Sequence, residues 1–115
     1  MTITILHNPR CSKSRQALQL LKAEGIEPEV VEYLRTPPDT GELSRILDLL
    51  GVAPRDLMRR KEQVYKDLGL DDPTLGRADL IAAMTENPVL IERPIVLAGG
   101  KAALGRPPEN VLSIL

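Results

Sequence analysis

The alternation of apolar and polar residues predicts that the chain begins with a strand, a helix and a second strand. Residues 2–7 are rich in β-branched side chains, which is typical of a buried strand. Ala17, Leu18 and Leu21 then lie on one face of a helix. Residues 29–33 alternate between apolar and polar positions and predict the second strand. A connection of this length favours a parallel pair with a right-handed crossover.

Turn and cap residues predict where the first helix begins and ends. Asn8-Pro9 is a turn signal directly after the first strand. Ser12 or Ser14 has the side chain of a helix N-cap, and Gly25 suits the end of the helix. We therefore expect one of these serines to cap the start of the helix and Gly25 to stop it.

The middle of the chain predicts several helices. Four aliphatic side chains recur at the spacing i, i+3, i+4 and i+7, namely Leu43, Ile46, Leu47 and Leu50. Asp39 or Thr40 is expected to cap this helix, and Gly51 to end it. Pro54 suits the first turn of a short helix through Arg60. Residues 77–86 predict a further helix.

The last part of the chain predicts a hairpin and a C-terminal helix. Residues 95–97 and 101–104 are expected to be strands, and Gly99-Gly100 fits the tight turn between them. The helix is expected to start at Pro107-Pro108 and to turn three side chains inward, namely Val111, Leu112 and Leu115.

Together these elements predict an α/β fold with a mixed four-stranded sheet. The order is β-α-β … β-β-α, and a helical segment of approximately residues 39–90 is inserted between the two parts. A length of 115 residues fits one domain, which we expect to span residues 1–115.

Composition and charge narrow the classes of function. Hydrophobic residues make up 43% of the chain and charged residues 27%, which indicates a globular protein. The net charge of −1 gives no reason to expect binding to nucleic acid or to an anionic membrane. No apolar stretch approaches membrane-spanning length, and the N-terminus lacks the pattern of a signal peptide. We expect a cytoplasmic protein.

Cys11, the single cysteine, lies where the first strand turns into the first helix. Unpaired backbone N–H groups and the helix dipole at such a position favour a thiolate, and they can also hold an oxyanion against the sulfur. Arg10, Lys13 and Arg15 add positive charge nearby. The alternative is that Cys11 is a small buried hydrophobic residue. His7 likewise fits a structural histidine as well as a functional one.

Other candidate residues are not specific when taken singly. One cysteine and one histidine do not make a metal site, and we expect no bound metal or cofactor. The basic residues between Arg55 and Lys61 fit a solvated helix face. Arg93 precedes a proline that opens a strand, and Arg106 precedes the last helix. Each of these two arginines fits a ligand contact or an ordinary surface charge.

In combination, however, these segments resemble the glutaredoxin-coupled arsenate reductases of the ArsC family, and the resemblance covers essentially the whole chain. The residues that carry it are His7-Asn8-Pro9, Cys11, Ser14-Arg15, Tyr33-Leu34, Pro37-Pro38, Leu57-Met58-Arg59, Tyr65, Leu68-Gly69-Leu70, Asn87-Pro88, Arg93-Pro94-Ile95-Val96 and Gly105-Arg106-Pro107. The order of these segments is specific, whereas Cys-Ser-Lys-Ser alone would be a weak signal.

The resemblance implies a thioredoxin-like fold, a cis bond before Pro94 and a set of site residues. Cys11 is implied to be the catalytic nucleophile. Three arginines are implied to bind the substrate anion, namely Arg59, Arg93 and Arg106. The implied supporting residues are His7, Asn8, Ser14 and Pro94.

The resemblance also implies a reaction and its partners. The thiolate attacks arsenate or a similar oxyanion, glutathione serves as co-substrate, and glutaredoxin completes the reduction to arsenite. Two alternatives remain. One is a Spx-like regulator that binds RNA polymerase, although such proteins commonly carry a Cys-x-x-Cys switch and the fourth position here is Ser14. The other is a one-cysteine, glutathione-dependent thiol transferase, which has no need for three arginines.

Overall fold

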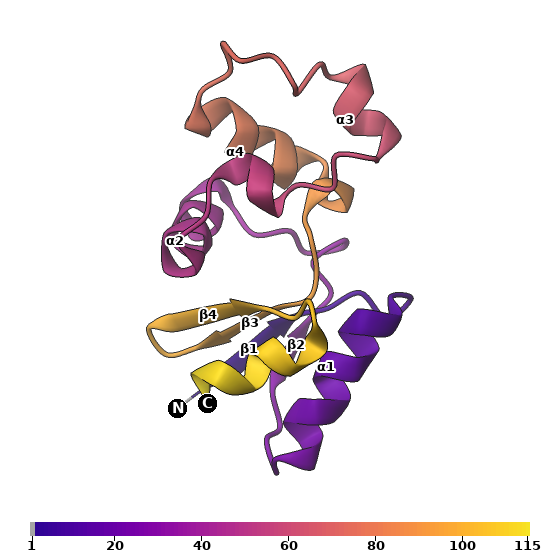
Figure 1. Ribbon diagram of the computed structural model, residues 1–115, viewed down its shortest axis with the longest axis vertical. Helices are drawn as coiled ribbons and strands as arrows, with labels where there is room; N and C mark the ends of the chain where they lie inside the picture. Colours follow the sequence, from indigo (N-terminus) through magenta and orange to yellow (C-terminus); the bar gives the residue numbers. More distant parts are fainter. Residues whose placement is uncertain (1) are drawn as a thin grey trace. The chain divides into compact units, whose positions relative to one another are not determined.

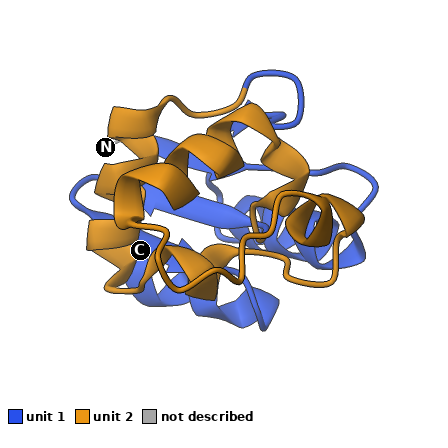
Figure 2. Ribbon diagram, turned by 90° about the horizontal axis from the view of Figure 1, so that it is seen from above, with its two compact units in different colours: residues 1–36, 93–115 blue, residues 37–92 orange. Residues whose placement is uncertain are grey.

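The computed structural model describes residues 2–115, which divide into two units (Figure 2). The first unit runs up to Thr36 and resumes at Arg93, and the second is Pro37–Glu92. The helical segment expected at about residues 39–90 lies within the second unit. The organisation of residues 1–115 as a single domain stays a prediction.

A four-stranded sheet forms the centre of the first unit, in the order β2-β1-β3-β4 (Figure 1). Its strands are β1 (Ile3–Leu6), β2 (Glu29–Val31), β3 (Ile95–Ala98) and β4 (Lys101–Leu104). β1 pairs with β2 in parallel and with β3 antiparallel, and β3 pairs antiparallel with β4. The predicted mixed α/β sheet is therefore confirmed. β2 is shorter than the expected range of residues 29–33.

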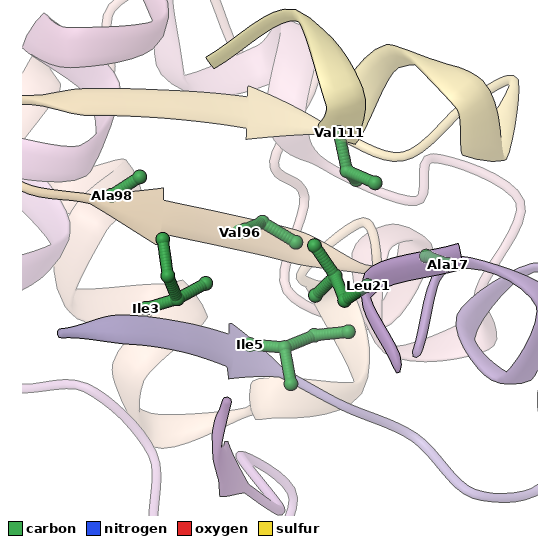
Figure 3. Close-up of a cluster of buried hydrophobic side chains, with 7 residues drawn as sticks. All are labelled: Ile3, Ile5, Ala17, Leu21, Val96, Ala98 and Val111. Atoms are coloured by element: carbon green, nitrogen blue, oxygen red, sulfur yellow. The ribbon is translucent and has the colours of Figure 1, made fainter. Parts of the chain in front are cut away.

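One face of the sheet is covered by α1 (Ser12–Ala23) and by the 3₁₀ helix η3 (Pro108–Ile114) (Figure 3). Alternate residues of a strand point to the same face, so β1 and β3 each contribute two side chains to this core. The buried cluster consists of Ile3, Ile5, Ala17, Leu21, Val96, Ala98 and Val111.

The N-cap of α1 is Cys11, so the prediction of Ser12 or Ser14 was wrong. The Cys11 side chain makes no capping hydrogen bond. Ser14 is fully buried and uses its hydroxyl in the preceding loop, where it accepts the Asn8 N–H at 3.0 Å. After the helix, Gly25 adopts the expected left-handed conformation with φ +77°.

The C-terminal helix differs from the prediction because it is a 3₁₀ helix. Val111 is buried, and Leu112 packs partly on the core, as expected. Leu115 is 47% exposed, so its predicted inward position was wrong. In a 3₁₀ helix the residues i and i+3 lie in line, and Ile114 therefore follows Val111 onto the core.

The second unit is helical and contains α2 (Thr40–Leu50), η1 (Pro54–Leu57), α3 (Gln63–Asp67), α4 (Arg77–Glu86) and η2 (Pro88–Leu90). Asp39 caps α2 by accepting the Glu42 N–H at 2.8 Å, and Gly51 ends it with φ +69°. The buried face of α2 packs against α4. The helix expected from Pro54 to Arg60 ends earlier because Met58 is extended and forms a β-bridge with Ile91.

No helix within residues 2–115 is both long enough and apolar enough to cross a membrane.

Candidate active site

Cys11 lies at the positive end of α1, with only 7% of its surface exposed. Its N–H donates to the Asn8 carbonyl at 3.0 Å, and its own carbonyl accepts the Arg15 N–H at 3.0 Å. The backbone N–H groups of Lys13 and Ser14 hydrogen-bond the sulfur. The turn between β1 and α1 therefore directs N–H donors at the thiol, as expected from the sequence.

Arg106 is the side chain that contacts this sulfur from another part of the chain. Its Nη2 lies 3.8 Å from Cys11 Sγ, and its Nε donates to the Arg93 carbonyl at 2.9 Å. The register of the β3–β4 hairpin explains how residues 93 and 106 meet. Ile95 is paired with Leu104, so Arg93 and Arg106, which lie two positions beyond that pair, are at the same end of the hairpin. The structure therefore brings Cys11, Arg93 and Arg106 together.

The pKa of the Cys11 thiol is set by opposing effects. Burial raises it, but the N–H groups of Ser14 and Lys13 and the positive charges of Arg93 and Arg106 lower it more. The net pKa is below its usual range, so more thiolate is present at neutral pH than in a free cysteine. The two positive charges that lower the pKa belong to Arg93 and Arg106, which flank the β3–β4 hairpin and are far from Cys11 in the sequence.

Gly105 and Pro94 hold the two arginine-bearing segments together. The Gly105 N–H donates to the Pro94 carbonyl at 2.9 Å. A Cβ atom added at Gly105 would lie 2.6 Å from Pro94 Cγ, so only glycine fits this approach. The Arg93–Pro94 bond is cis, as predicted, and the Arg106–Pro107 bond is also cis, which was not foreseen.

His7 and Ser14 form a buried pair behind the cysteine loop. The Ser14 Oγ lies 2.6 Å from His7 Nδ1 and accepts the Asn8 N–H. Burial lowers the pKa of His7; Glu32 raises it, and Arg15 and Lys22 lower it further. His7 is therefore neutral at pH 7 and suited to hydrogen bonding. The Asn8 side chain closes the turn by accepting the Arg10 N–H at 3.0 Å.

Arg59 lies in the second unit, on the segment between η1 and α3. Its Nη1 pairs with Glu62 Oε1 at 2.9 Å, and its N–H donates to the Leu90 carbonyl at 2.7 Å. A role for Arg59 beside Cys11 stays a prediction.

Arg55, by contrast, is not the solvated charge that its sequence context suggested. Its Nε and Nη2 donate to the carbonyls of Leu70 and Asp72, at 3.1 Å and 2.7 Å. The nearby Tyr65 hydroxyl donates to Asp71 at 2.6 Å. Burial raises the pKa of Tyr65, and the carboxylate of Asp71 raises it further. These residues fix the turn after α3, a role that no local signal revealed.

Among residues 2–115, no group of three or more histidine, cysteine, aspartate and glutamate side chains is placed to hold a metal ion.

The sheet order and the cysteine at the start of α1 define a thioredoxin-like thiol protein. The chain belongs to the ArsC family, whose model matches residues 6–114. It is 57% identical to the arsenate reductase of Neisseria meningitidis serogroup B, over 98% of this chain and 97% of the relative. It is equally similar to the protein YfgD of Escherichia coli K12, with 57% identity over 98% and 96% of the two chains.

A solved structure gives the same result for the fold. The arsenate reductase from Vibrio cholerae superposes with a TM-score of 0.97 at 52% identity, covering 100% of this chain and 98% of that one.

Proposed function

We propose that this protein is an arsenate reductase in which the Cys11 thiolate attacks the arsenic of bound arsenate. The observation that carries the proposal is the position of Arg106, whose Nη2 lies 3.8 Å from a sulfur at the positive end of α1. A nucleophile and donors for an oxyanion are therefore within reach of one another. Relatives named arsenate reductase share about half of the sequence over almost the whole chain.

The arginines have distinct tasks in this proposal. Arg106 and Arg93 neutralise the oxyanion and stabilise the charge that develops when arsenate loses an oxygen as water. Arg59 is the third anion-binding residue. His7, Asn8 and Ser14 are positioning residues, because they hold the turn that directs N–H groups at the sulfur. Pro94 keeps Arg93 beside Gly105 and Arg106.

The complete reaction needs two external thiols. In the first step, the attack of Cys11 forms a Cys11–arsenic bond and releases water. Glutathione then bonds to arsenic and a second water leaves. The thiol of glutaredoxin attacks the glutathione sulfur, which forms a mixed disulfide and leaves two electrons on arsenic. Water hydrolyses the Cys11–arsenic(III) bond and releases arsenite. The sum is arsenate plus two thiols giving arsenite, one disulfide and one water, so a single protein cysteine suffices.

A coupled assay tests the proposal. Arsenate, glutathione, glutaredoxin and an NADPH-linked glutathione reductase are mixed with the protein, and NADPH oxidation is followed. We expect arsenate-dependent turnover that Cys11→Ser abolishes, because an alcohol ionises far less readily than a thiol. Arg106→Ala should lower kcat/KM for arsenate by roughly 10²–10³, the usual effect of removing one oxyanion donor.

The same assay includes a glutathionylated peptide as the competing substrate and Arg60→Ala as an arginine control. Turnover of the peptide without turnover of arsenate would overturn the proposal in favour of a thiol transferase. Cys11→Ser with more than a few per cent of wild-type arsenate activity would overturn the mechanism.

A further inference from the structure

A groove beside Cys11 is not used by the proposed anion site. It has a volume of about 550 Å³, within the range of about 300–1,000 Å³ of small-molecule sites. One wall is a face of α1, and the other is the start of η3. The lining residues are Ser12, Arg15, Gln16, Gln19, Leu20, Pro108 and Glu109.

One end of this groove is formed by residues that adjoin the reactive site in the chain. Ser12 follows Cys11 directly, and Pro108 is two residues after Arg106, whose guanidinium contacts the sulfur. From there the groove follows α1 as far as Leu20. At a rise of 1.5 Å per residue, the eight steps from Ser12 to Leu20 correspond to about 12 Å. A molecule in the groove can therefore begin next to the turn that carries Cys11 and extend along α1 away from it.

The walls of the groove carry opposite charges. Arg15 on α1 is exposed, and a single contact with the Pro9 carbonyl, at 2.9 Å, occupies one of the five N–H donors of its guanidinium. Glu109 on η3 is an exposed carboxylate. The amides of Gln16 and Gln19 add donors and acceptors, and Leu20 and Pro108 add apolar surface.

We infer that this groove is the glutathione site, an inference that rests on the proposed function. The γ-glutamyl end of glutathione carries a carboxylate and an ammonium on one carbon, which matches a guanidinium on one wall and a carboxylate on the other. The thiol of the central cysteine lies at the end next to Cys11. The γ-glutamyl arm follows α1, since two extended residues span about 7 Å and the groove is longer than this. The amide of the arm meets Gln16 or Gln19.

Binding of S-methylglutathione, which cannot bond to arsenic through its blocked sulfur, tests the site without turnover. We expect the NMR signals of the Gln16, Gln19 and Glu109 amides to move on titration. Glu109→Lys should weaken binding about fivefold, because it removes one favourable charge contact and adds a repulsive one. Glu24→Lys is the matched control, since it makes the same charge change at the C-cap of α1, outside the groove, and should leave the Kd unchanged.

Turnover supplies the second readout. The KM for glutathione should rise about fivefold in Glu109→Lys while the KM for arsenate stays constant. Three results would overturn the inference. The first is no binding of S-methylglutathione at 20 mM, since an affinity of roughly 1 mM is the weakest expected. The others are NMR signal changes outside the groove and equal Kd values for Glu109→Lys and Glu24→Lys. Binding in the groove without arsenate turnover would instead overturn the proposed function and leave the groove assigned.

Discussion

Replacing Gly105 by alanine tests the packing that joins the two arginine-bearing segments. The new Cβ would lie 2.6 Å from Pro94 Cγ, 3.2 Å from Pro94 Cδ and 3.3 Å from Val111 Cγ1. The first distance is shorter than real Cβ contacts allow. Pro94 is a ring bonded into the backbone, and Val111 is fully buried in the core, so neither neighbour can move away at low cost.

The expected loss of stability follows from these contacts. Forcing one methyl group into a packed site costs about 1–3 kcal/mol. Lengthening the 2.9 Å hydrogen bond from Gly105 N–H to the Pro94 carbonyl adds about 1 kcal/mol. We therefore expect Gly105→Ala to lower the free energy of unfolding by roughly 2–4 kcal/mol. Because Arg93 and Arg106 flank these two residues, kcat/KM for arsenate should fall as well, by about a hundredfold.

Urea unfolding and the coupled arsenate assay measure the two effects. Gly100→Ala is the matched control, since a Cβ at Gly100 meets nothing within 4 Å and Gly100 is not among the glycines with positive φ. It should change stability by no more than about 0.5 kcal/mol. If Gly105→Ala is as stable and as active as Gly100→Ala, the close packing at Pro94 does not position the arginines.

Three further predictions concern titration and the second unit. The folded-state pKa of His7 lies below its unfolded value. The free energy of unfolding should therefore fall as the pH drops from about 6.5 through the folded pKa. Urea unfolding at a series of pH values measures this decrease, which His7→Gln should lack. The thiolate absorbance of Cys11 should titrate below the free value of about 8.5. The contribution of this thiolate to the free energy of unfolding is present above that pH and is lost as the pH falls through the folded pKa. Titration at about 8.5 or above would contradict the effect of the Ser14 and Lys13 N–H groups and of the two arginines. Arg55→Ala should lower the free energy of unfolding by about 1–2 kcal/mol, measured in urea and thermal unfolding, because two carbonyls lose a charged donor. Arg60→Ala is the control and should change it by less than about 0.5 kcal/mol, since Arg60 Nη2 is 3.8 Å from an exposed Asp56. Equal effects of the two variants would show that Arg55 does not hold its turn.

Much of the fold was predictable because its signals are local. The β-branched run at the start, the stripe of aliphatic residues on α2 and the glycine pair of the hairpin each specify an element through a few neighbouring residues. The position of Cys11 between a strand and a helix likewise predicted a thiol that meets backbone N–H groups. The prediction failed where two local preferences competed, as at Ser14, whose hydroxyl can cap a helix or bond within the preceding loop and does the second.

Only the tertiary structure decided which charges act on the sulfur. The basic residues next to Cys11 in sequence suggested one set, and the register of an antiparallel hairpin supplied another, because it places residues 93 and 106 at the same end. The tertiary structure also explains Gly105, because Pro94, eleven positions earlier in the chain, leaves no space for a Cβ atom there. It likewise explains Arg55, whose hydrogen-bond partners are 15 and 17 residues away. Periodicity and turn signals describe the chain over a few residues, whereas these contacts depend on strand pairing and loop closure over longer separations. A family resemblance named Arg93 and Arg106, but the hairpin register supplies the physical reason that they meet.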